Sequence, residues 1–598
     1  MNMNDKRVTA GRCLHSAGYK DNHFSGINIV HCVLGAVGLI TVSGLTLAQE
    51  VPALTPDRSK AQQPMDAPVM KQDTKSESLE LPKVQAGTEL VPAGDTIVLQ
   101  QIQFAGSTVF TDAELLEQVA AYLNRPIRAS DIETIRRKIS QYYIDHGYIN
   151  SGAVLESQSM ADGTLRVKII EGRLTEVRQT GQERLREGYI RDRLIAGSGE
   201  PLNIQELQDS YRLLLGDPLI KQLNGQLIPG GHLGEAVLDL NVTRARPYQL
   251  YFGADDYQTP AVGAYTGRIG GWVDNLLTLG ERIDAQFIVN EGGLGYNTGI
   301  NVPVNAAGTR VSFNYNDTVS RIVEKPSDVL NITNHILGFD GGLSHAVYRT
   351  FADELNLGLN FAVRQNKTLL GDNCLPEGLN IDTCETQVTV LRMSQKFSHK
   401  GETNNLVFWS TFNVGLDLFD ATITEPGYQS GEFFSWLGQS MFTQRLWDGG
   451  PLLVLKGNIQ LADKPLLNLE RYAVGGVYTA RGYRENTYVR DNGFNTNLEV
   501  HYPLFQSYMS GNNYFHLVPF LDYGGAWNNR IKGLEDDVFM GYKTDYLFSA
   551  GIGFNWQFHN VYTEFYWANA FTPVKNSPVT EHSIQDDGIH FRVNINAF

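Results

Sequence analysis

The chain has 598 residues and a formal net charge of −16, from 49 Lys and Arg against 65 Asp and Glu. This length allows several domains, and the acidic balance argues against nucleic acid as a partner, because proteins that bind it carry clustered positive charge. The 59 glycines, 27 tyrosines and 28 phenylalanines beside only 19% charged residues indicate a β-rich chain with many turns. After residue 48 no stretch reaches the ~18 apolar residues of a membrane-spanning helix, so the mature chain is either soluble or crosses a membrane as strands.

The first 48 residues have the features of an export signal. Basic residues in the first twenty positions precede a mostly apolar run over residues 27–47, and a small-x-small sequence ends at Ala48. We therefore assign residues 1–48 to a signal peptide that is cleaved after Ala48. The alternative is an uncleaved anchor helix, because the apolar run is long for a signal peptide, and in either case the rest of the chain is exported.

Residues 49–95 are predicted to be a linker with little fixed structure. The segment is largely polar, and its prolines would interrupt any helix. These prolines are Pro52, Pro56, Pro64, Pro68, Pro82 and Pro92.

Residues 96–173 predict a small α+β module. A strand-like run at 97–106 is followed by two helices that each begin with a capping box, at residues 111–114 and 130–133. Two strands then surround the turn at residues 161–163. The predicted order is β-α-α-β-β.

The same order repeats over residues 174–246. A strand leads into a short helix at 187–196, a second helix is capped by Asn203, and two strands at 221–230 and 236–245 close the unit. Two similar modules in tandem form an internal repeat. We expect each to have a sheet with a free edge.

From residue 247 to residue 598 the helical period disappears. Segments of about 10 residues alternate between apolar and polar positions, and about 16 such segments can be distinguished, which is typical of a transmembrane β-barrel. A closed barrel has no exposed sheet edge, so its strands can span lipid. An array of soluble β-sandwiches is the alternative, but it does not explain why helix is nearly absent over such a length.

A polar run at about residues 463–493 interrupts the alternating segments. It contains the paired glycines Gly475 and Gly476 and then the sequence Arg481-Gly482-Tyr483. Connections between strands are usually far shorter, and long loops are either functional or disordered. We interpret this one as an ordered insert, although Arg-Gly alone also occurs by chance in surface loops.

Cysteine and histidine usage predicts a disulfide but no catalytic or metal site. Cys13 and Cys32 fall in the leader, which leaves Cys374 and Cys384 as an expected disulfide in an oxidising compartment. Their spacing, with no histidine nearby, is poor for zinc. No Ser-His-Asp order, metal cluster or phosphate-binding loop is evident, and the isolated His582 and His590 are expected to be structural or solvated. We predict neither an enzyme nor a cofactor.

The order of export signal, linker, two modules and barrel resembles the two-partner secretion transporters. These form the haemolysin secretion/activation family within the outer-membrane assembly-factor superfamily. The modules are similar to POTRA domains, which makes residues 96–173 POTRA 1 and residues 174–246 POTRA 2. Sequences similar to family signatures are YIDHGY at 143–148, IEGRL at 170–174, GEPLN at 199–203, LIPG at 227–230, GG at 475–476, ARGY at 480–483 and FLDYG at 520–524.

This resemblance implies a 16-stranded barrel whose sixth extracellular loop folds back into the lumen, where a loop arginine meets a strand aspartate. Here those residues are Arg481 and Asp522, and a guanidinium in a partly shielded pore needs a carboxylate with fixed geometry. Gly482 would then supply a tight turn, and Tyr483 would pack on the barrel wall. The loop motif comprises Gly475, Gly476, Arg481, Gly482 and Tyr483, and the strand motif comprises Phe520, Asp522 and Gly524.

The function implied by the resemblance is outer-membrane translocation of an unfolded partner exoprotein, without ATP, by a monomer embedded in lipid and lipopolysaccharide. The expected partner is a large secreted protein of the β-helical haemolysin or adhesin type. Two alternatives stay open: an assembly factor that inserts other barrels, which usually carries more than two modules, and a passive porin, which would lack the modules and the lumen loop. Family members often begin with a helix that plugs the pore, but the prolines of residues 49–95 argue against a clear one.

Overall fold

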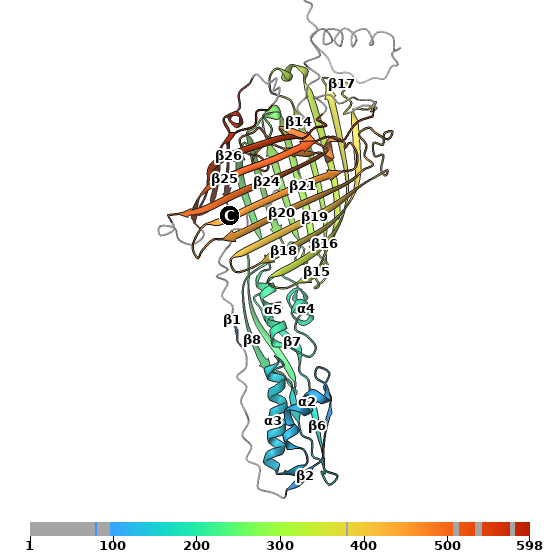
Figure 1. The fold of residues 1–598 in the computed structure, drawn as a ribbon, viewed down its shortest axis with the longest axis vertical. Helices are drawn as coiled ribbons and strands as arrows, with labels where there is room; N and C mark the ends of the chain where they lie inside the picture. The colour runs from blue at the N-terminus through green and yellow to red at the C-terminus, as the bar shows by residue number, and fades with distance from the viewer. Residues whose placement is uncertain are drawn as a thin grey trace, which may run out of the picture. The chain divides into compact units, whose positions relative to one another are not determined.

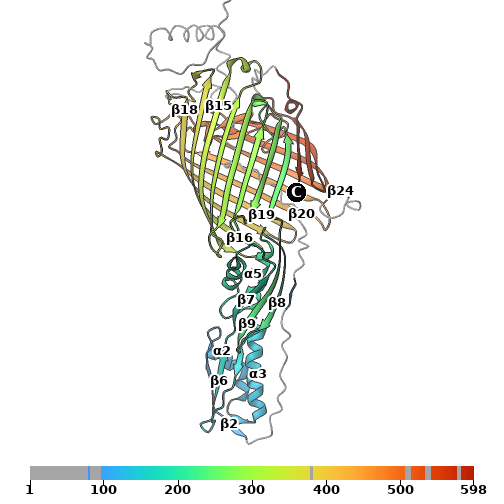
Figure 2. The same cartoon turned by 180° about the vertical axis from the view of Figure 1, so that it is seen from behind.

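The computed structural model describes residues 78–80, 96–377, 381–505, 513–532, 541–574 and 581–597. The predicted signal peptide and most of the predicted linker lie outside these ranges. Within them the chain forms two α+β modules followed by a closed β-barrel (Figures 1 and 2). None of the helices in these ranges is long and apolar enough to cross a membrane.

The first module packs two helices on a small sheet. Its helix α2 begins at a capping box in which Thr111 and Glu114 bond each other's backbone amides, and it buries Leu115 and Val119. The sheet has the order β3-β6-β5, with β3 and β6 parallel. The elements are β2 (Ile97–Leu99), β3 (Gln101–Ala105), α2 (Asp112–Val119), the 3-10 helix η1 (Ala120–Tyr122), β4 (Arg125–Ile127), α3 (Ala129–Asp145), β5 (Gly152–Val154) and β6 (Thr164–Ile170).

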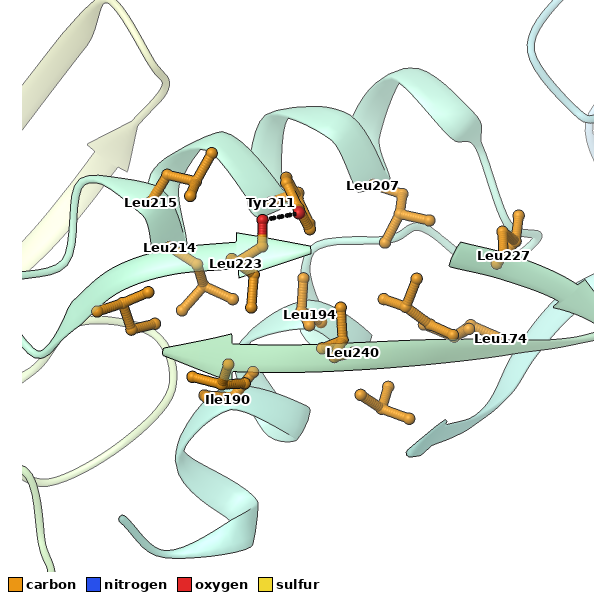
Figure 3. Packing of buried hydrophobic residues seen from close by; sticks show 14 of the residues in the cluster. Leu174, Ile190, Leu194, Leu207, Tyr211, Leu214, Leu215, Leu223, Leu227 and Leu240 are labelled. Carbon is orange, nitrogen blue, oxygen red and sulfur yellow. Dashed lines mark hydrogen bonds between the residues drawn. The ribbon is translucent and has the colours of Figure 1, made fainter. Parts of the chain in front are cut away.

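The second module repeats the plan around a larger core. Leu207, Tyr211 and Leu214 lie on the face of α5 that covers the sheet (Figure 3). The buried hydroxyl of Tyr211 donates to the carbonyl of Leu223 at 2.5 Å, which satisfies its polar end inside the core. The elements are β7 (Arg173–Thr180), α4 (Glu187–Ala196), α5 (Ile204–Leu215), β8 (Ile220–Pro229) and β9 (Glu235–Arg244).

Among the described residues the second sheet keeps a free edge at β7, as predicted, but its other edge is occupied. Strand β1 (Ser78–Glu80) pairs in parallel with β8, which places Leu79 opposite Gly225. A Cβ added to Gly225 would lie 3.1 Å from Cδ1 of Leu79, so the missing side chain gives Leu79 room against the core. The prediction of little fixed structure in the linker is therefore wrong for these three residues, because Leu79 packs into the space left by the missing side chain of Gly225.

The barrel confirms the predicted 16 antiparallel strands, and a two-residue strand, β17 (Asn373–Cys374), lies beside β16. Neighbouring residues face opposite sides of the wall: Asp522 is fully buried, whereas Leu521 beside it is 47% exposed. The strands are β10 (Tyr248–Asp255), β11 (Thr266–Asp274), β12 (Arg282–Val289), β13 (Gly293–Pro303), β14 (Arg310–Arg321), β15 (Ile332–Arg349), β16 (Asp353–Leu370), β18 (Glu385–Lys400), β19 (Asn404–Leu416), β20 (Phe434–Arg445), β21 (Leu452–Ala462), β24 (Asn492–Leu504), β25 (Tyr514–Trp527), β26 (Asp545–Phe558), β27 (Val561–Ala570) and β28 (Ile589–Asn596).

The predicted disulfide is absent, because Cys374 and Cys384 are both free thiols. Cys374 pairs with Leu369 of β16, and the carbonyl of Cys384 accepts the amide of Thr368 at 2.8 Å. The two cysteines therefore have neighbouring partners on β16. The two thiols nevertheless hydrogen-bond each other, so the structure brings the predicted pair together without the S–S bond.

Replacing Leu207 by alanine should destabilise the second module. Leu207 is fully buried in its core, so the free energy of unfolding should fall by ~2–5 kcal/mol through lost burial and a residual cavity. Urea unfolding of a purified segment spanning residues 96–246 measures this change. Leu233→Ala is the control because Leu233 is 76% exposed, and equal effects of the two substitutions would contradict the described core.

Candidate functional site

The long connection between β21 and β24 is a folded element. It contains the 3-10 helix η4 (Asn468–Glu470) and two short strands, β22 (Tyr472–Val474) and β23 (Tyr488–Arg490), that pair with each other. Tyr472, Val474 and Ala480 are almost completely buried, in one cluster with Ala526 of β25. The loop therefore packs against the inner face of the barrel wall, as the resemblance implies.

The structure brings Arg481 and Asp522 into direct contact. The guanidinium donates through Nε to Oδ2 and through Nη2 to Oδ1 of Asp522, both at 2.8 Å, and the Arg481 amide donates to Oδ2 at 2.9 Å. Both side chains are buried, with exposed fractions of 2% and 0%. A bidentate pair of this kind fixes orientation as well as charge, because two parallel bonds allow only one relative placement.

A second carboxylate and two aromatic rings complete the environment of the Arg481 guanidinium. Glu499 on β24 lies 3.0 Å from Nη2. The guanidinium carbon is 3.6 Å from the ring centroid of Phe520 and 4.8 Å from that of Tyr566. Stacking and charge pairing together replace the water that a buried guanidinium loses.

Glu499 and Tyr566 were not predicted as site residues. The sequence does carry one indication of Glu499: it lies on β24, where the alternation of side chains places it on the same face as Asn497 and His501. His501 lies 2.8 Å from Glu499 and Lys456 lies 3.5 Å from it, so this carboxylate has further partners beside Arg481. No pattern in the sequence links Tyr566 to the loop, because β27 reaches this position only through the pairing of β25 with β26 and of β26 with β27.

Asn497 connects the loop to Asp522. Its side-chain amide donates to Oδ1 of Asp522 and to the carbonyl of Thr479, both at 2.8 Å. One residue of β24 therefore orients the carboxylate and holds the loop backbone two residues before Arg481. This positioning role was also missed by the sequence analysis.

The predicted glycines lie where the loop turns or approaches the wall closely. Gly482 has φ +88°, and a Cβ there would lie 3.0 Å from Cβ of Ala568. Gly475 and Gly476 also have positive φ, at +112° and +96°. A Cβ at Gly524 would lie 2.8 Å from Val474 of the loop. Each position needs glycine because an L side chain would be strained or would push the loop off the wall.

Tyr483 is held at both ends of its side chain. Its ring is buried, and its hydroxyl oxygen lies 2.8 Å from the carbonyl of Phe548 and 3.1 Å from that of Thr572, either of which can accept its one proton. The same oxygen accepts the amides of Phe548 and Thr572, at 3.2 and 3.0 Å. One hydroxyl thus bonds backbone groups within β26 and just beyond the end of β27.

Arg484, which the sequence analysis did not select, pairs with acids from two other loops. It donates to Glu324 at 2.6 Å and to both carboxylate oxygens of Asp586. Burial raises the pKa of Asp586, but the hydrogen bonds from Arg484 and from the Ser583 amide, together with the nearby positive charge, hold that pKa below its ordinary value. The residue after the predicted motif therefore ties the loop to two of its neighbours.

Within the described part of the chain, no group of three or more His, Cys, Asp and Glu side chains could hold a metal ion. The site is instead a set of buried charges that fixes a loop. Such an arrangement can hold the loop in one position against the wall, and it can release the loop when the ion pairs separate.

Comparison with protein-family models gives two matches. Residues 97–172 match the POTRA domain of ShlB type. Residues 234–555, more than half of the chain, match the haemolysin secretion/activation protein family ShlB/FhaC/HecB. The chain belongs to this family.

Curated relatives and solved structures agree with this assignment. The ShlB/FhaC/HecB-family chain is 23% identical over 444 residues to the outer membrane transporter CdiB of Escherichia coli O6:K15:H31, covering 71% of each protein. It is 21% identical over 472 residues to the heme/hemopexin transporter protein HuxB of Haemophilus influenzae strain 86-028NP, covering 75% of this chain and 78% of HuxB. The solved structure of CdiB from Escherichia coli superimposes with a TM-score of 0.64 at 20% identity, over 86% of this chain and 92% of CdiB.

Family membership gives the broad role. This ShlB/FhaC/HecB-family protein is an outer-membrane transporter of the two-partner secretion type, with its POTRA region in the periplasm. The Arg481 site therefore belongs to a transport barrel.

Removing the hydroxyl of Tyr483 should loosen the loop without emptying its aromatic pocket. Tyr483→Phe leaves the backbone groups of Phe548 and Thr572 without their shared partner, which should cost ~1–3 kcal/mol. The measurement is the rate of proteolysis within residues 463–491 of the purified protein. Tyr265→Phe is the matched control, since Tyr265 is 57% exposed, and equal protection of both variants would contradict a role for the hydroxyl.

Proposed function

We propose that this protein binds an unfolded partner exoprotein in the periplasm and passes it through the barrel to the cell surface, with the loop that carries Arg481 controlling the path. The observation that supports this is the buried bidentate pair between Arg481 and Asp522. A loop held by charges inside a transport barrel has a defined resting position, and those contacts can be exchanged when a client enters the lumen. A passive porin has no need of such a loop.

The periplasmic modules take the client as an extended strand at a sheet edge, because main-chain hydrogen bonds recognise any unfolded segment. In the second module β8 is already paired with β1. A client strand can therefore use that edge only by displacing residues 78–80. In the first module β5 pairs on one side with β6, and the described sheet continues no further beyond it.

Transport proceeds without nucleotide. The client threads the barrel as an extended chain and folds outside, and that folding makes the return unfavourable because the folded form cannot re-enter the pore. The client is a large secreted protein of β-helical haemolysin or adhesin type. The barrel works as a monomer in contact with outer-membrane lipid and lipopolysaccharide.

The second candidate is an assembly factor that inserts other barrels. The likeness to the solved structure of BamA from Haemophilus ducreyi, with a TM-score of 0.50 at 14% identity, supports this alternative at the level of fold alone. The two candidates differ in product: a translocator releases or displays its client outside, whereas an assembly factor leaves barrels in the membrane. Deleting the gene and then measuring both the client delivered outside and the barrels left in the membrane distinguishes the two candidate functions.

Substituting Arg481 should abolish or severely reduce secretion while the barrel still reaches the membrane. Arg481→Ala leaves Asp522 and Glu499 buried without their cation, and a stranded buried charge costs ~3–5 kcal/mol. Arg481→Lys should rescue poorly because an ammonium cannot form the two parallel bonds. The readout is surface delivery of the exported protein encoded beside this gene, with barrel folding checked by heat-modifiable gel mobility.

Arg349→Ala is the control for these variants, because Arg349 forms a half-exposed ion pair with Glu354 that should be worth only ~0–1 kcal/mol. The double variant Arg481→Ala/Asp522→Ala should lose less than the two single losses combined, since the residues share one contact. Normal secretion by Arg481→Ala would remove the pair from the mechanism.

The periplasmic segment should be sufficient to bind the client. A purified segment of residues 96–246 lacks β1, so the edge of β8 is open, and we expect it to bind an amino-terminal fragment of the exoprotein in a fluorescence titration. Restoring residues 78–80 should weaken that binding, and Leu79→Asp in the longer segment should strengthen it again. A folded 96–246 segment with no affinity, beside a barrel that binds alone, would show that recognition lies elsewhere.

A further inference from the structure

The strands that close the barrel are joined by a short ladder. Strands β10 and β28, which we call the closing seam, pair over five residues, from Tyr251 with Asn596 to Asp255 with Arg592. The neighbouring pairs are longer, with eight residue pairs between β10 and β11 and seven between β27 and β28. Contacts from outside the ladder can therefore contribute a larger share of the stability of this seam than of its neighbours.

The tip of the long loop touches this seam through Tyr478. Arg592 of β28 donates to the Tyr478 hydroxyl, and the two tyrosine rings Tyr478 and Tyr257 meet edge to face with centroids 5.6 Å apart. The Arg592 guanidinium lies 4.3 Å from the Tyr257 ring centroid and 3.3 Å from Glu564. Tyr257 in turn donates to Glu564 at 2.9 Å. The loop, β28 and the segment after β10 thus share one cation.

A second contact runs from the backbone of Gly482 to the same seam. The Gly482 amide faces Nε2 of His590 at 3.4 Å, and Nδ1 of His590 lies 3.6 Å from Asp256. Asp256 follows β10 directly and accepts the amide of Phe591 at 2.7 Å, so it also bridges the two strands. His590 and Asp256 are fully buried. The histidine that looked isolated in the sequence lies between the loop and the seam.

A third contact uses the short helix η7 (Ile584–Asp587) before β28. The Glu485 amide donates to the side-chain oxygen of Gln585 at 2.9 Å. The side-chain NH2 group of Gln585 donates to the carbonyls of Asp256 and Gln258, at 2.5 and 2.9 Å. Gln585 is fully buried, so it fixes the loop to the segment that follows β10.

We propose that Tyr478, Gly482 and Glu485 form a second anchor of the loop at the closing seam, so that release of the loop and pairing of β10 with β28 are linked. The first anchor joins Arg481 to β25, and the second joins the same few residues to β28 and β10. The loop tip therefore contacts both β25 and the seam at which the barrel closes. This inference rests on the proposed function, since it concerns the loop that controls the path.

The linkage follows from reciprocity. If loop contacts stabilise the seam, then loosening the seam removes partners of the loop and favours its release by the same factor. His590, Arg592 and Gln585 are then positioning residues: they act on transport through the loop and need not touch the client. The loop and the seam respond as one two-state element.

The test records single channels of the purified full-length protein in planar lipid bilayers. Tyr478→Phe keeps the ring but loses the bond to Arg592, and it should shift the equilibrium toward the open state roughly tenfold, as expected for one lost hydrogen bond to a charged group. Arg592→Leu should shift it at least as far. Arg592→Lys should retain part of the closed population, because an ammonium can still bond Tyr478 and Glu564.

A reversible lock tests the link to the seam. Gly253 and Asn594 are directly opposed across β10 and β28, and a Cβ at Gly253 would lie 2.5 Å from the Asn594 side chain. Cysteines at both positions, in a background lacking Cys374 and Cys384, should form a disulfide on oxidation. The lock should return Tyr478→Phe to the parent open fraction, and reduction should restore the open phenotype.

Two outcomes would overturn the proposal: a Tyr478→Phe channel that behaves like the parent, or one that stays open with the lock formed. Tyr546→Phe, at a tyrosine that is 47% exposed on β26, is the matched control. Heat-modifiable mobility verifies that each variant is a folded barrel. Because the recordings need no exoprotein, their failure is distinct from a failure of secretion, which would count against the proposed function instead.

Discussion

The buried positive charge of Arg481 is the constraint on which the lumen side of this barrel depends. A guanidinium that is 2% exposed is stable only if carboxylates with fixed geometry replace its water. Asp522 supplies the bidentate partner, Glu499 a second charge and Phe520 a stacking surface. These residues come from neighbouring strands, so the pair can form only after the wall has formed.

The loop itself behaves as part of the fold. Its two short strands, its glycines with positive φ and the buried ring of Tyr483 give it one conformation against the wall. Polar contacts hold the loop on both sides of Arg481: Asn497 bonds the carbonyl of Thr479 before it, and Arg484 after it pairs with Glu324. An element that is held by several contacts can be released stepwise.

In the second module one sheet edge is covered by a short strand of the same chain. The β8 edge is covered by three residues of the same chain, with Leu79 placed over Gly225. Such a short strand makes few backbone bonds, so its hold is weak beside that of the long ladders of the barrel. The physical consequence is an edge that is protected from unspecific pairing and still available to a longer strand.

The sequence by itself determined the class of the protein: alternation predicted a 16-stranded barrel, helical period and the capping box at 111–114 predicted helices of the modules, and family-like motifs selected Arg481 and Asp522. These signals are local or nearly so, since a strand's alternation is written along its own residues. Tertiary structure alone decided that β1 covers β8, that Cys374 and Cys384 stay unbonded, and that Glu499 and His590 lie beside the loop. Strand pairing and the folding of the loop bring these residues together, Gly482 and His590 across 108 positions, and no local pattern encodes which residues will meet.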